Sequence, residues 1–227
     1  MALVDADGTS GKMFFSLFDG SIKRNVDKNS QGARGRINKS GKTVYEKFYR
    51  SISGRFIKIE KKSHEEFGDS WVIDLRDGEE TYSLQIPYSS RQADGFLRRV
   101  PLLELEKDLE ITCGVYDGKP YLTLKQNGGK VEYYWTREKP GSLPPMVQIQ
   151  VKGKYIWDDT DKMAYLERYV NERLIPKLTE LNPVVESELP PTELGGGNND
   201  PMPEFKPSVI PSSNNNPPIP EEDDLPF

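Results

Sequence analysis

The stretch WVIDLRDGEETYSLQIP (residues 71–87) carries the strongest fold signal in the sequence. Apolar and polar residues alternate on both sides of Asp77-Gly78, and this dipeptide between two alternating runs is typical of a β-hairpin. We therefore expect two antiparallel strands, at residues 71–76 and 79–87. The side chains expected to face the core are Trp71, Ile73 and Leu75 on the first strand and Tyr82, Leu84 and Ile86 on the second.

Another alternating run precedes this hairpin, at residues 52–62. Alternation with a period of two predicts a strand that is buried on one face. On this pattern Ile57 and Ile59 face the core, and Phe56 and Lys58 face outward. The outward position makes the Phe56 ring available to a ligand, to the N-terminal strand or to another subunit.

After the hairpin the hydrophobic period becomes helical and then returns to two. We expect a short helix with Ala93, Phe96, Leu97 and Val100 on its apolar face, then strands at residues 109–116, 121–126 and 131–136. Three strands, one helix and two further strands follow one another in an OB-fold, a five-stranded Greek-key barrel with a bridging helix. SH3-like barrels and partial sandwiches produce similar orders, so the order by itself indicates a mainly β fold.

Further elements flank this barrel within a predicted domain of residues 1–182. They are an N-terminal strand at 13–18, a mobile basic loop at 25–43, a strand at 147–156 and a helix from about 160 to 181. Asp158 or Thr160 is expected to cap the helix, and Pro176 to kink or shorten it. The apolar stripe of this helix predicts that it packs on the barrel.

Residues 183–227 differ from the rest of the chain, because they are rich in Pro, Asn and Gly and show almost no apolar pattern. Such a segment cannot bury enough apolar surface to fold, so we expect a disordered linker and tail. The segment holds nine acids against one base, whereas residues 12–62 hold fourteen Lys or Arg against four acids. This contrast indicates polyanion binding with an internal competitor, or else two solvated surfaces that do not interact.

The last seven residues, EEDDLPF, form an acidic run that ends in an aliphatic residue, a proline and a phenylalanine. This ending resembles the C-terminal tip of bacterial and bacteriophage single-stranded DNA-binding proteins (SSBs). The resemblance implies an OB-fold that binds and protects single-stranded DNA, without sequence specificity, during replication, recombination and repair. It also implies a tip that binds the proteins of these processes and, in some phage members, folds back over the DNA groove. The tip residues expected to bind partners are Asp223, Asp224, Leu225, Pro226 and Phe227.

The N-terminal strand, long basic loop and C-terminal helix make the chain more similar to the phage replication type of SSB than to the short bacterial type. This similarity implies a monomer or homodimer, with no enzymatic activity and no cofactor. The one cysteine, Cys113, and the one histidine, His64, do not make a disulfide framework or a multi-cysteine zinc site. No apolar run approaches a membrane span, and no signal-peptide layout is present, so we expect a cytoplasmic protein, in a bacterial host cell if it is phage-encoded.

A protein that holds single strands without reading their sequence needs cations for the phosphates and aromatic faces for the bases. Both types occur on the predicted outer face of the barrel, at the turn 117–120 and in the basic loop. The rim of the groove is expected at this turn and at the loop 61–70. The candidate nucleic-acid-binding residues are Arg34, Arg36, Lys39, Lys42, Arg50, Arg55, Phe56, Lys58, Lys62, Tyr116, Lys119, Tyr121 and Lys125.

Other functions fit parts of the sequence. A recombination mediator or an RNA-binding OB-fold protein would have the same kind of groove, and the Leu-Pro-Phe ending favours the SSB over both. The segment GRINKSGKT (35–43) resembles a phosphate-binding loop of nucleotide hydrolases. Its spacing is one residue too long, Arg36 occupies a glycine position, and no strand leads into it. The sequence thus favours a DNA-binding protein over a hydrolase.

Overall fold

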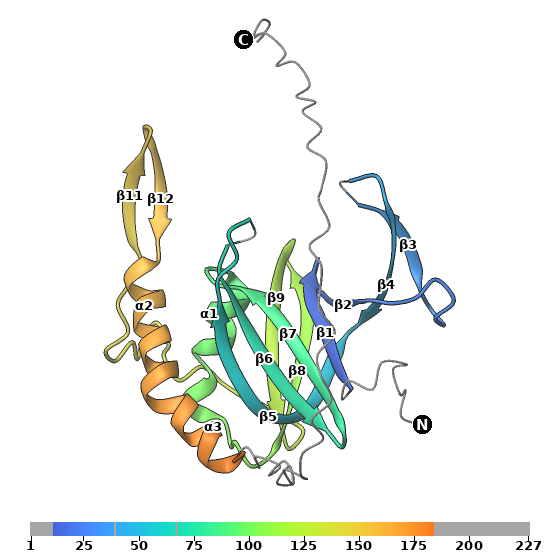
Figure 1. Cartoon of the computed structure of the whole chain (residues 1–227). Coiled ribbons are helices and arrows are strands. Elements are labelled where there is room, and N and C mark those ends of the chain that lie inside the picture. Colours follow the sequence, from blue (N-terminus) through green and yellow to red (C-terminus); the bar gives the residue numbers. More distant parts are fainter. Residues whose placement is uncertain (1–10, 39, 67, 184–227) are drawn as a thin grey trace, which may run out of the picture. The chain divides into compact units, whose positions relative to one another are not determined.

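The computed structural model describes residues 11–38, 40–66 and 68–183 (Figure 1). The chain divides into two compact units, Met1–Val185 and Glu186–Phe227, and all described residues belong to the first. This unit is mainly β, which confirms the coarser part of the predicted fold class. The predicted disordered tail beyond residue 183, with its five tip residues, lies outside the described residues, as does Lys39.

Ten strands form one mixed sheet, in the spatial order β10-β9-β8-β5-β6-β7-β1-β2-β4-β3. Their bounds are β1 Lys12–Phe18, β2 Ser21–Asn25, β3 Arg34–Ile37, β4 Thr43–Tyr49, β5 Ser51–Lys62, β6 Ser70–Asp77, β7 Glu80–Pro87, β8 Asp108–Tyr116, β9 Lys119–Gln126 and β10 Gly129–Lys130. A separate hairpin consists of β11 (Val147–Val151) and β12 (Lys154–Asp158).

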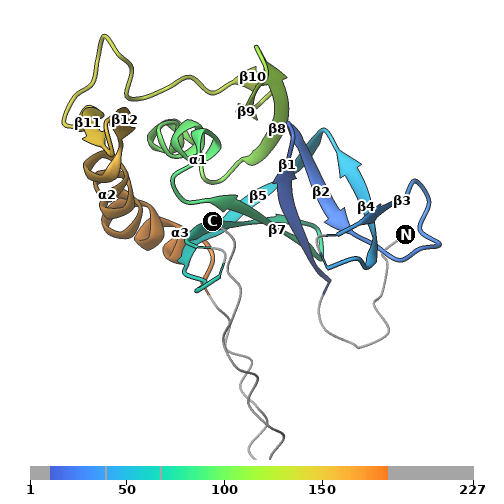
Figure 2. The ribbon, with the colours of Figure 1, turned by 90° about the horizontal axis from the view of Figure 1, so that it is seen from above.

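Four ladders join the five strands that the sequence assigns to a barrel. Antiparallel ladders join β9 to β8, β8 to β5, β5 to β6 and β6 to β7. The helix α1 (Arg91–Leu97) follows β7, and the short turn η1 (Val100–Leu102) leads toward β8. The free edge of β7 pairs in parallel with β1, and among the described residues no ladder joins β7 to β9. The sheet therefore continues from β7 into β1, β2, β4 and β3 (Figure 2), and it does not close.

The core is centred on the hairpin of β6 and β7. Trp71, Ile73 and Leu75 are at most 1% exposed, and Leu84 and Ile86 are fully buried, as predicted. The helix α1 starts at the N-cap Ser90, whose hydroxyl accepts a hydrogen bond from the backbone N–H of Ala93 at 3.0 Å. Its predicted apolar face is also buried in this core.

The predicted orientation of β5 is wrong in its middle, because the strand contains an irregularity. The register with β6 shifts between Phe56 and Lys58, so that Ile57 is an extra residue in the ladder. An extra residue reverses the side-chain alternation beyond it. Phe56 and Ile59 therefore both face the core, at 1% and 2% exposure, and Ile57 lies between them at the bulge.

Three predicted segments differ from the structure in secondary structure. The basic loop 25–43 contains the strand β3, which forms a hairpin with β4. The strand predicted at 131–136 is absent, since only Gly129–Lys130 continue the sheet there as β10. The strand predicted at 147–156 is the hairpin β11–β12, whose turn Lys152-Gly153 has positive φ at both residues. Sequence alternation does not reveal such short hairpins when a turn lacks a strong signal.

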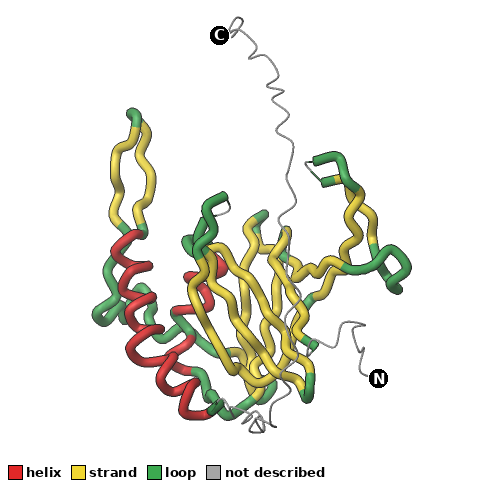
Figure 3. Tube along the Cα trace, in the orientation of Figure 1, coloured by secondary structure: helices red, strands yellow, loops and turns green. Residues whose placement is uncertain are grey.

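The C-terminal helix consists of α2 (Thr160–Tyr169), the π-helical turn η2 (Val170–Leu174) and α3 (Ile175–Leu181), which form one continuous rod (Figure 3). Asp158 accepts hydrogen bonds from the N–H and the hydroxyl of Thr160, at 3.0 and 2.6 Å. The π turn lies directly before Pro176, whose ring cannot fit in a regular helix interior. The described part of the chain contains no helix long and apolar enough to cross a membrane.

Candidate nucleic-acid interface

The structure distributes the predicted binding residues over three places in the sheet. Arg34, Arg36 and Lys42 lie on the β3–β4 hairpin; Arg50, Arg55, Phe56, Lys58 and Lys62 lie on or just before β5; Tyr116, Lys119, Tyr121 and Lys125 lie on β8 and β9. The β8–β9 hairpin is the only one of these groups in which predicted aromatic and basic residues are both exposed within the described residues.

The group on β5 fits the prediction poorly. Phe56 is buried and packs edge-on against Phe96 at a centroid distance of 5.8 Å, so the prediction that it stacks on a base is wrong. Lys58 and Lys62 are exposed, but both form ion pairs with Glu60, at 2.8 and 3.1 Å. The hydrogen bond from Lys58 is the main reason why the pKa of Glu60 is lowered. The carboxylate therefore offsets part of the positive charge on this strand.

The β8–β9 hairpin presents its tyrosines to solvent. Tyr116 is 80% exposed and Tyr121 is 40% exposed. The two-residue turn Asp117-Gly118 has φ values of 51° and 66°, and such primed turns match the twist of the strands they join. The turn therefore keeps Tyr116 and its cross-strand partner Lys119 at the tip of a regular hairpin.

The Tyr121 ring lies across Gly114, its cross-strand partner on β8. A Cβ atom added to Gly114 would lie 2.7 Å from the Tyr121 hydroxyl oxygen and 2.8 Å from the ring carbon that carries it. A glycine is therefore required here for the ring to lie close to the sheet. The sequence pattern gives no sign of this contact.

These tyrosines border a cleft of about 330 Å³ that we call the tyrosine cleft. Its basic residues come from separate elements, since Arg91 begins α1 and Lys130 lies on β10. Among the described residues, the lining contains four cations and no carboxylate. The lining residues are Arg91, Arg99, Tyr116, Lys119, Tyr121, Leu122, Thr123, Lys130 and Tyr133. Sequence reasoning missed Arg91, Arg99, Lys130 and Tyr133, because the fold alone brings them to the hairpin.

Arg99 is a buried cation in the wall of this cleft, at 3% exposure. Its guanidinium donates hydrogen bonds to the backbone carbonyls of Gly95 at 2.6 Å, Val131 at 3.0 Å and Leu122 at 3.3 Å. The guanidinium also lies 3.7 Å from the centre of the Tyr133 ring. Because these partners carry no net negative charge, the positive charge of Arg99 is held in place without being neutralised.

Lys125 lies further along β9 and is paired with Glu110 at 3.5 Å, outside the lining of the cleft. Cys113, beside Gly114 on β8, is buried, and burial raises the pKa of its thiol to about 12. Within the described ranges, no group of three or more His, Cys, Asp or Glu side chains is arranged to hold a metal ion.

No protein-family model matches the chain, and no curated protein or solved structure matches it either.

Proposed function

We propose that this chain binds single-stranded DNA without sequence specificity, as the resemblance of its C-terminal tip to SSBs implies. The observation that carries the proposal is the tyrosine cleft, where three tyrosine rings and four cations meet without a lining carboxylate among the described residues. We propose further that the five strands β9, β8, β5, β6 and β7 are an OB-fold whose closing edge is occupied by β1.

The chemistry of the cleft suits an unpaired strand. Tyr116 and Tyr121 offer exposed rings on which bases stack, and every base has a face for such contact. Arg91, Lys119 and Lys130 lie around these rings and can contact phosphates. A duplex keeps its base faces stacked inside, so a surface of this kind favours single strands and is indifferent to sequence.

The proposal is tested with the double variant Tyr116→Ala/Tyr121→Ala and its matched control Tyr116→Phe/Tyr121→Phe. Stacking is worth about 1–3 kcal/mol per base, so the alanine variant should bind oligo-dT at least about 30-fold more weakly. The phenylalanine variant keeps both rings and should bind like the wild type. Fluorescence anisotropy with labelled oligo-dT, oligo-U and a duplex measures these affinities.

Two outcomes would contradict the proposal: a wild-type protein that prefers the duplex, or an alanine variant that binds oligo-dT normally. Tighter binding of oligo-U than of oligo-dT would instead favour the RNA-binding alternative, since that class of protein has the same kind of groove.

We also propose that the acidic tip binds partner proteins, with Phe227 as the residue that enters a pocket. The tail can compete with DNA for the basic surface of the same chain, because it is tethered to it. Removal of residues 217–227 should then tighten binding of oligo-dT at low salt. An unchanged affinity for oligo-dT would show that the tip does not compete with DNA and binds partner proteins only.

A further inference from the structure

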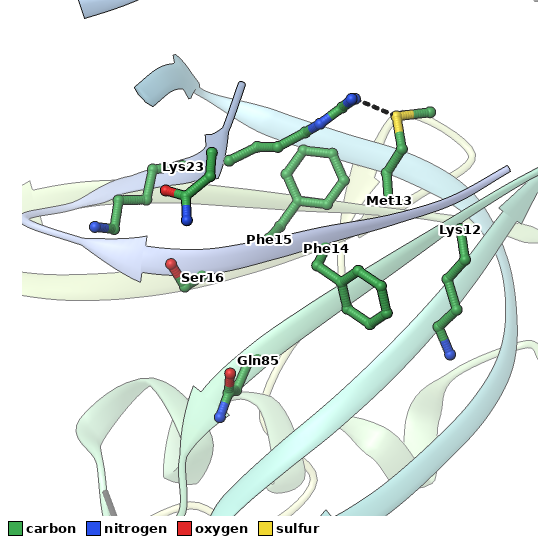
Figure 4. Close-up of a pocket in the computed structure, with 9 residues that line it drawn as sticks. Lys12, Met13, Phe14, Phe15, Ser16, Lys23 and Gln85 are labelled. Atoms are coloured by element: carbon green, nitrogen blue, oxygen red, sulfur yellow. Dashed lines mark hydrogen bonds between the residues drawn. The ribbon is translucent and has the colours of Figure 1, made fainter. Parts of the chain in front are cut away.

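The outward face of β1 carries exposed phenylalanines. Met13, Phe15 and Leu17 point toward the core, so the alternation of the strand turns Phe14 and Phe18 to the other side. Phe14 is 65% exposed and Phe18 is 47% exposed. Figure 4 shows Lys12 and Phe14 on the side of β1 opposite Met13 and Phe15. Nothing in the core requires two large apolar rings on this side.

A third ring continues this row on β4. Ser16 on β1 is opposite Lys23 on β2, and Lys23 is opposite Phe48 on β4, so these three residues share one face of the sheet. The Phe18 and Phe48 rings lie 6.2 Å apart. We call this surface the phenylalanine face. It consists of Phe14, Phe18 and Phe48 with Lys12, Lys23 and Arg34.

Each ring of the phenylalanine face has a cation beside it. Lys12 Nζ lies 5.7 Å from the centre of Phe14, Lys23 Nζ lies 5.0 Å from Phe18, and the Arg34 guanidinium lies 5.7 Å from Phe48. Surfaces that dock other proteins are depleted of charged residues at their centres. Rings that alternate with cations are instead the arrangement that holds a single strand, whose bases stack while its phosphates are neutralised.

Two buried carboxylates fix Lys12 and Lys23 in place. Asp74, at 3% exposure, accepts a hydrogen bond from Lys12 at 2.9 Å. Glu46, at 2% exposure, accepts from Lys23 at 2.7 Å and from Arg36 at 2.8 Å. Arg34 adds a further cation on this face, so four cations (Lys12, Lys23, Arg34 and Arg36) stand against two carboxylates, and the carboxylates lie beneath the surface.

A pocket of about 420 Å³ adjoins the rings, where β1 and β2 separate (Figure 4). The two strands pair only from Ser16 to Phe18, so the beginning of β1 has β7 as its strand partner and the end of β2 has β4. Lys12, Lys23 and Arg24 line this pocket, and its described lining contains no carboxylate. A phosphate group fits such a pocket in size and would meet these three cations, of which Lys12 and Lys23 also pair with Asp74 and Glu46.

We infer that the phenylalanine face is a second contact surface for single-stranded nucleic acid, with bases on Phe14 and Phe18 and a phosphate in the pocket beside them. This inference rests on the proposed function, because it extends the path of the same kind of ligand. It predicts that the protein contacts more nucleotides than the tyrosine cleft alone could hold.

The decisive comparison is between Phe14→Leu/Phe18→Leu and Phe14→Tyr/Phe18→Tyr. Leucine keeps an apolar side chain but has no ring, so the leucine variant should bind long oligo-dT at least about tenfold more weakly. The tyrosine variant should bind like the wild type. Oligo-dT of increasing length should show the difference only above the length that saturates the tyrosine cleft. Phe14 and Phe18 are both exposed, and circular dichroism checks that each variant remains folded.

The outcomes separate the inference from the proposed function. A wild-type protein that binds no single strand overturns both. Normal binding of long oligo-dT by the leucine variant overturns the inference alone. The inference also fails if the leucine variant binds DNA normally but changes its sedimentation from dimer to monomer, because a second copy of the chain would then occupy this face.

Discussion

The tyrosine cleft and the phenylalanine face place positive charge beside aromatic rings in two different ways. In the cleft, the buried Arg99 is held by backbone carbonyls, and the described lining has no carboxylate. On the phenylalanine face, buried Asp74 and Glu46 hold the cations by ion pairs. In the cleft, Lys130 pairs with the exposed Glu132 at 3.4 Å, and no carboxylate lies in the described lining itself. On the phenylalanine face, each of the two buried carboxylates offsets the charge of a lysine. Binding at the cleft should therefore depend more strongly on salt.

The largest effect should come from removing rings on both surfaces. The variant with Tyr116→Ala, Tyr121→Ala, Phe14→Leu and Phe18→Leu should bind long oligo-dT at least about 300-fold more weakly, because four stacking contacts are lost. The free-energy losses of the two double variants should add, since the surfaces share no residue. Fluorescence anisotropy on all three variants measures this. A combined loss no greater than that of the tyrosine variant would show that the surfaces do not hold the same strand.

The next effect should come from Gly114→Ala. The new Cβ would lie 2.7–3.0 Å from the hydroxyl oxygen and two ring carbons of Tyr121 and must displace this side chain. The loss of one stacking contact corresponds to about tenfold weaker binding of oligo-dT. Gly129→Ala on the neighbouring β10 is the control, since its Cβ would have only an ordinary contact, 3.6 Å from the Gln126 carbonyl oxygen. Equal affinities of the two variants would mean that the position of Tyr121 does not matter for binding.

A smaller effect should distinguish the charges of the two surfaces. Arg91→Gln/Lys119→Gln should reduce the slope of log affinity against log salt by about 1.4, because each phosphate contact on a single strand contributes about 0.7. Lys12→Gln/Lys23→Gln should reduce the slope by less, since Asp74 and Glu46 already offset the charges of these two lysines. Titrations from low to moderate salt measure both slopes. The reverse ranking would contradict the comparison.

The smallest effect on DNA affinity, but a clear one on stability, should come from Glu46. Hydrogen bonds from Arg36 and Lys23 lower the pKa of Glu46 from 4.5 to about 2. A carboxyl whose pKa is lower in the folded state stabilises the fold above the unfolded-state pKa, and this contribution is lost as the pH falls through the folded-state pKa. The wild type should therefore melt at a higher temperature than Glu46→Gln at pH 6. The two melting temperatures should converge as the pH falls from 4.5 to 2. A constant difference in melting temperature across that pH range would show that Arg36 and Lys23 do not lower the pKa of Glu46.

Local patterns predicted the centre of the fold well. The hairpin at Asp77-Gly78, the buried face of α1 and the stripe of the C-terminal helix all follow from periods of two or 3.6 residues. The bulge at Ile57 could not be predicted in this way, because one extra residue reverses the alternation without changing the composition. The parallel pairing of β1 with β7 joins segments far apart in the sequence, and no local signal encodes it.

Local signals also account for the candidate site residues that the sequence predicts. Tyr116, Lys119 and Tyr121 were predicted because a strong turn signal lies between them. Phe14 and Phe18 were missed because the run MFFSLF looks uniformly apolar, and only the pairing with β7 and β2 shows which rings face outward. Arg91 and Lys130 reach the tyrosine cleft from elements whose placement depends on the whole sheet.

The buried thiol of Cys113 can be used to follow ligand binding. It is the one thiol in the sequence, it lies buried on β8 beside Gly114, and burial raises its pKa to about 12. An alkylating reagent in solution can react with this thiol only while β8 is locally open. The alkylation rate therefore reports how often β8 opens. Single-stranded DNA bound on the adjacent Tyr116 and Tyr121 would slow the alkylation. Ligand occupancy could thus be followed by mass spectrometry on unlabelled protein.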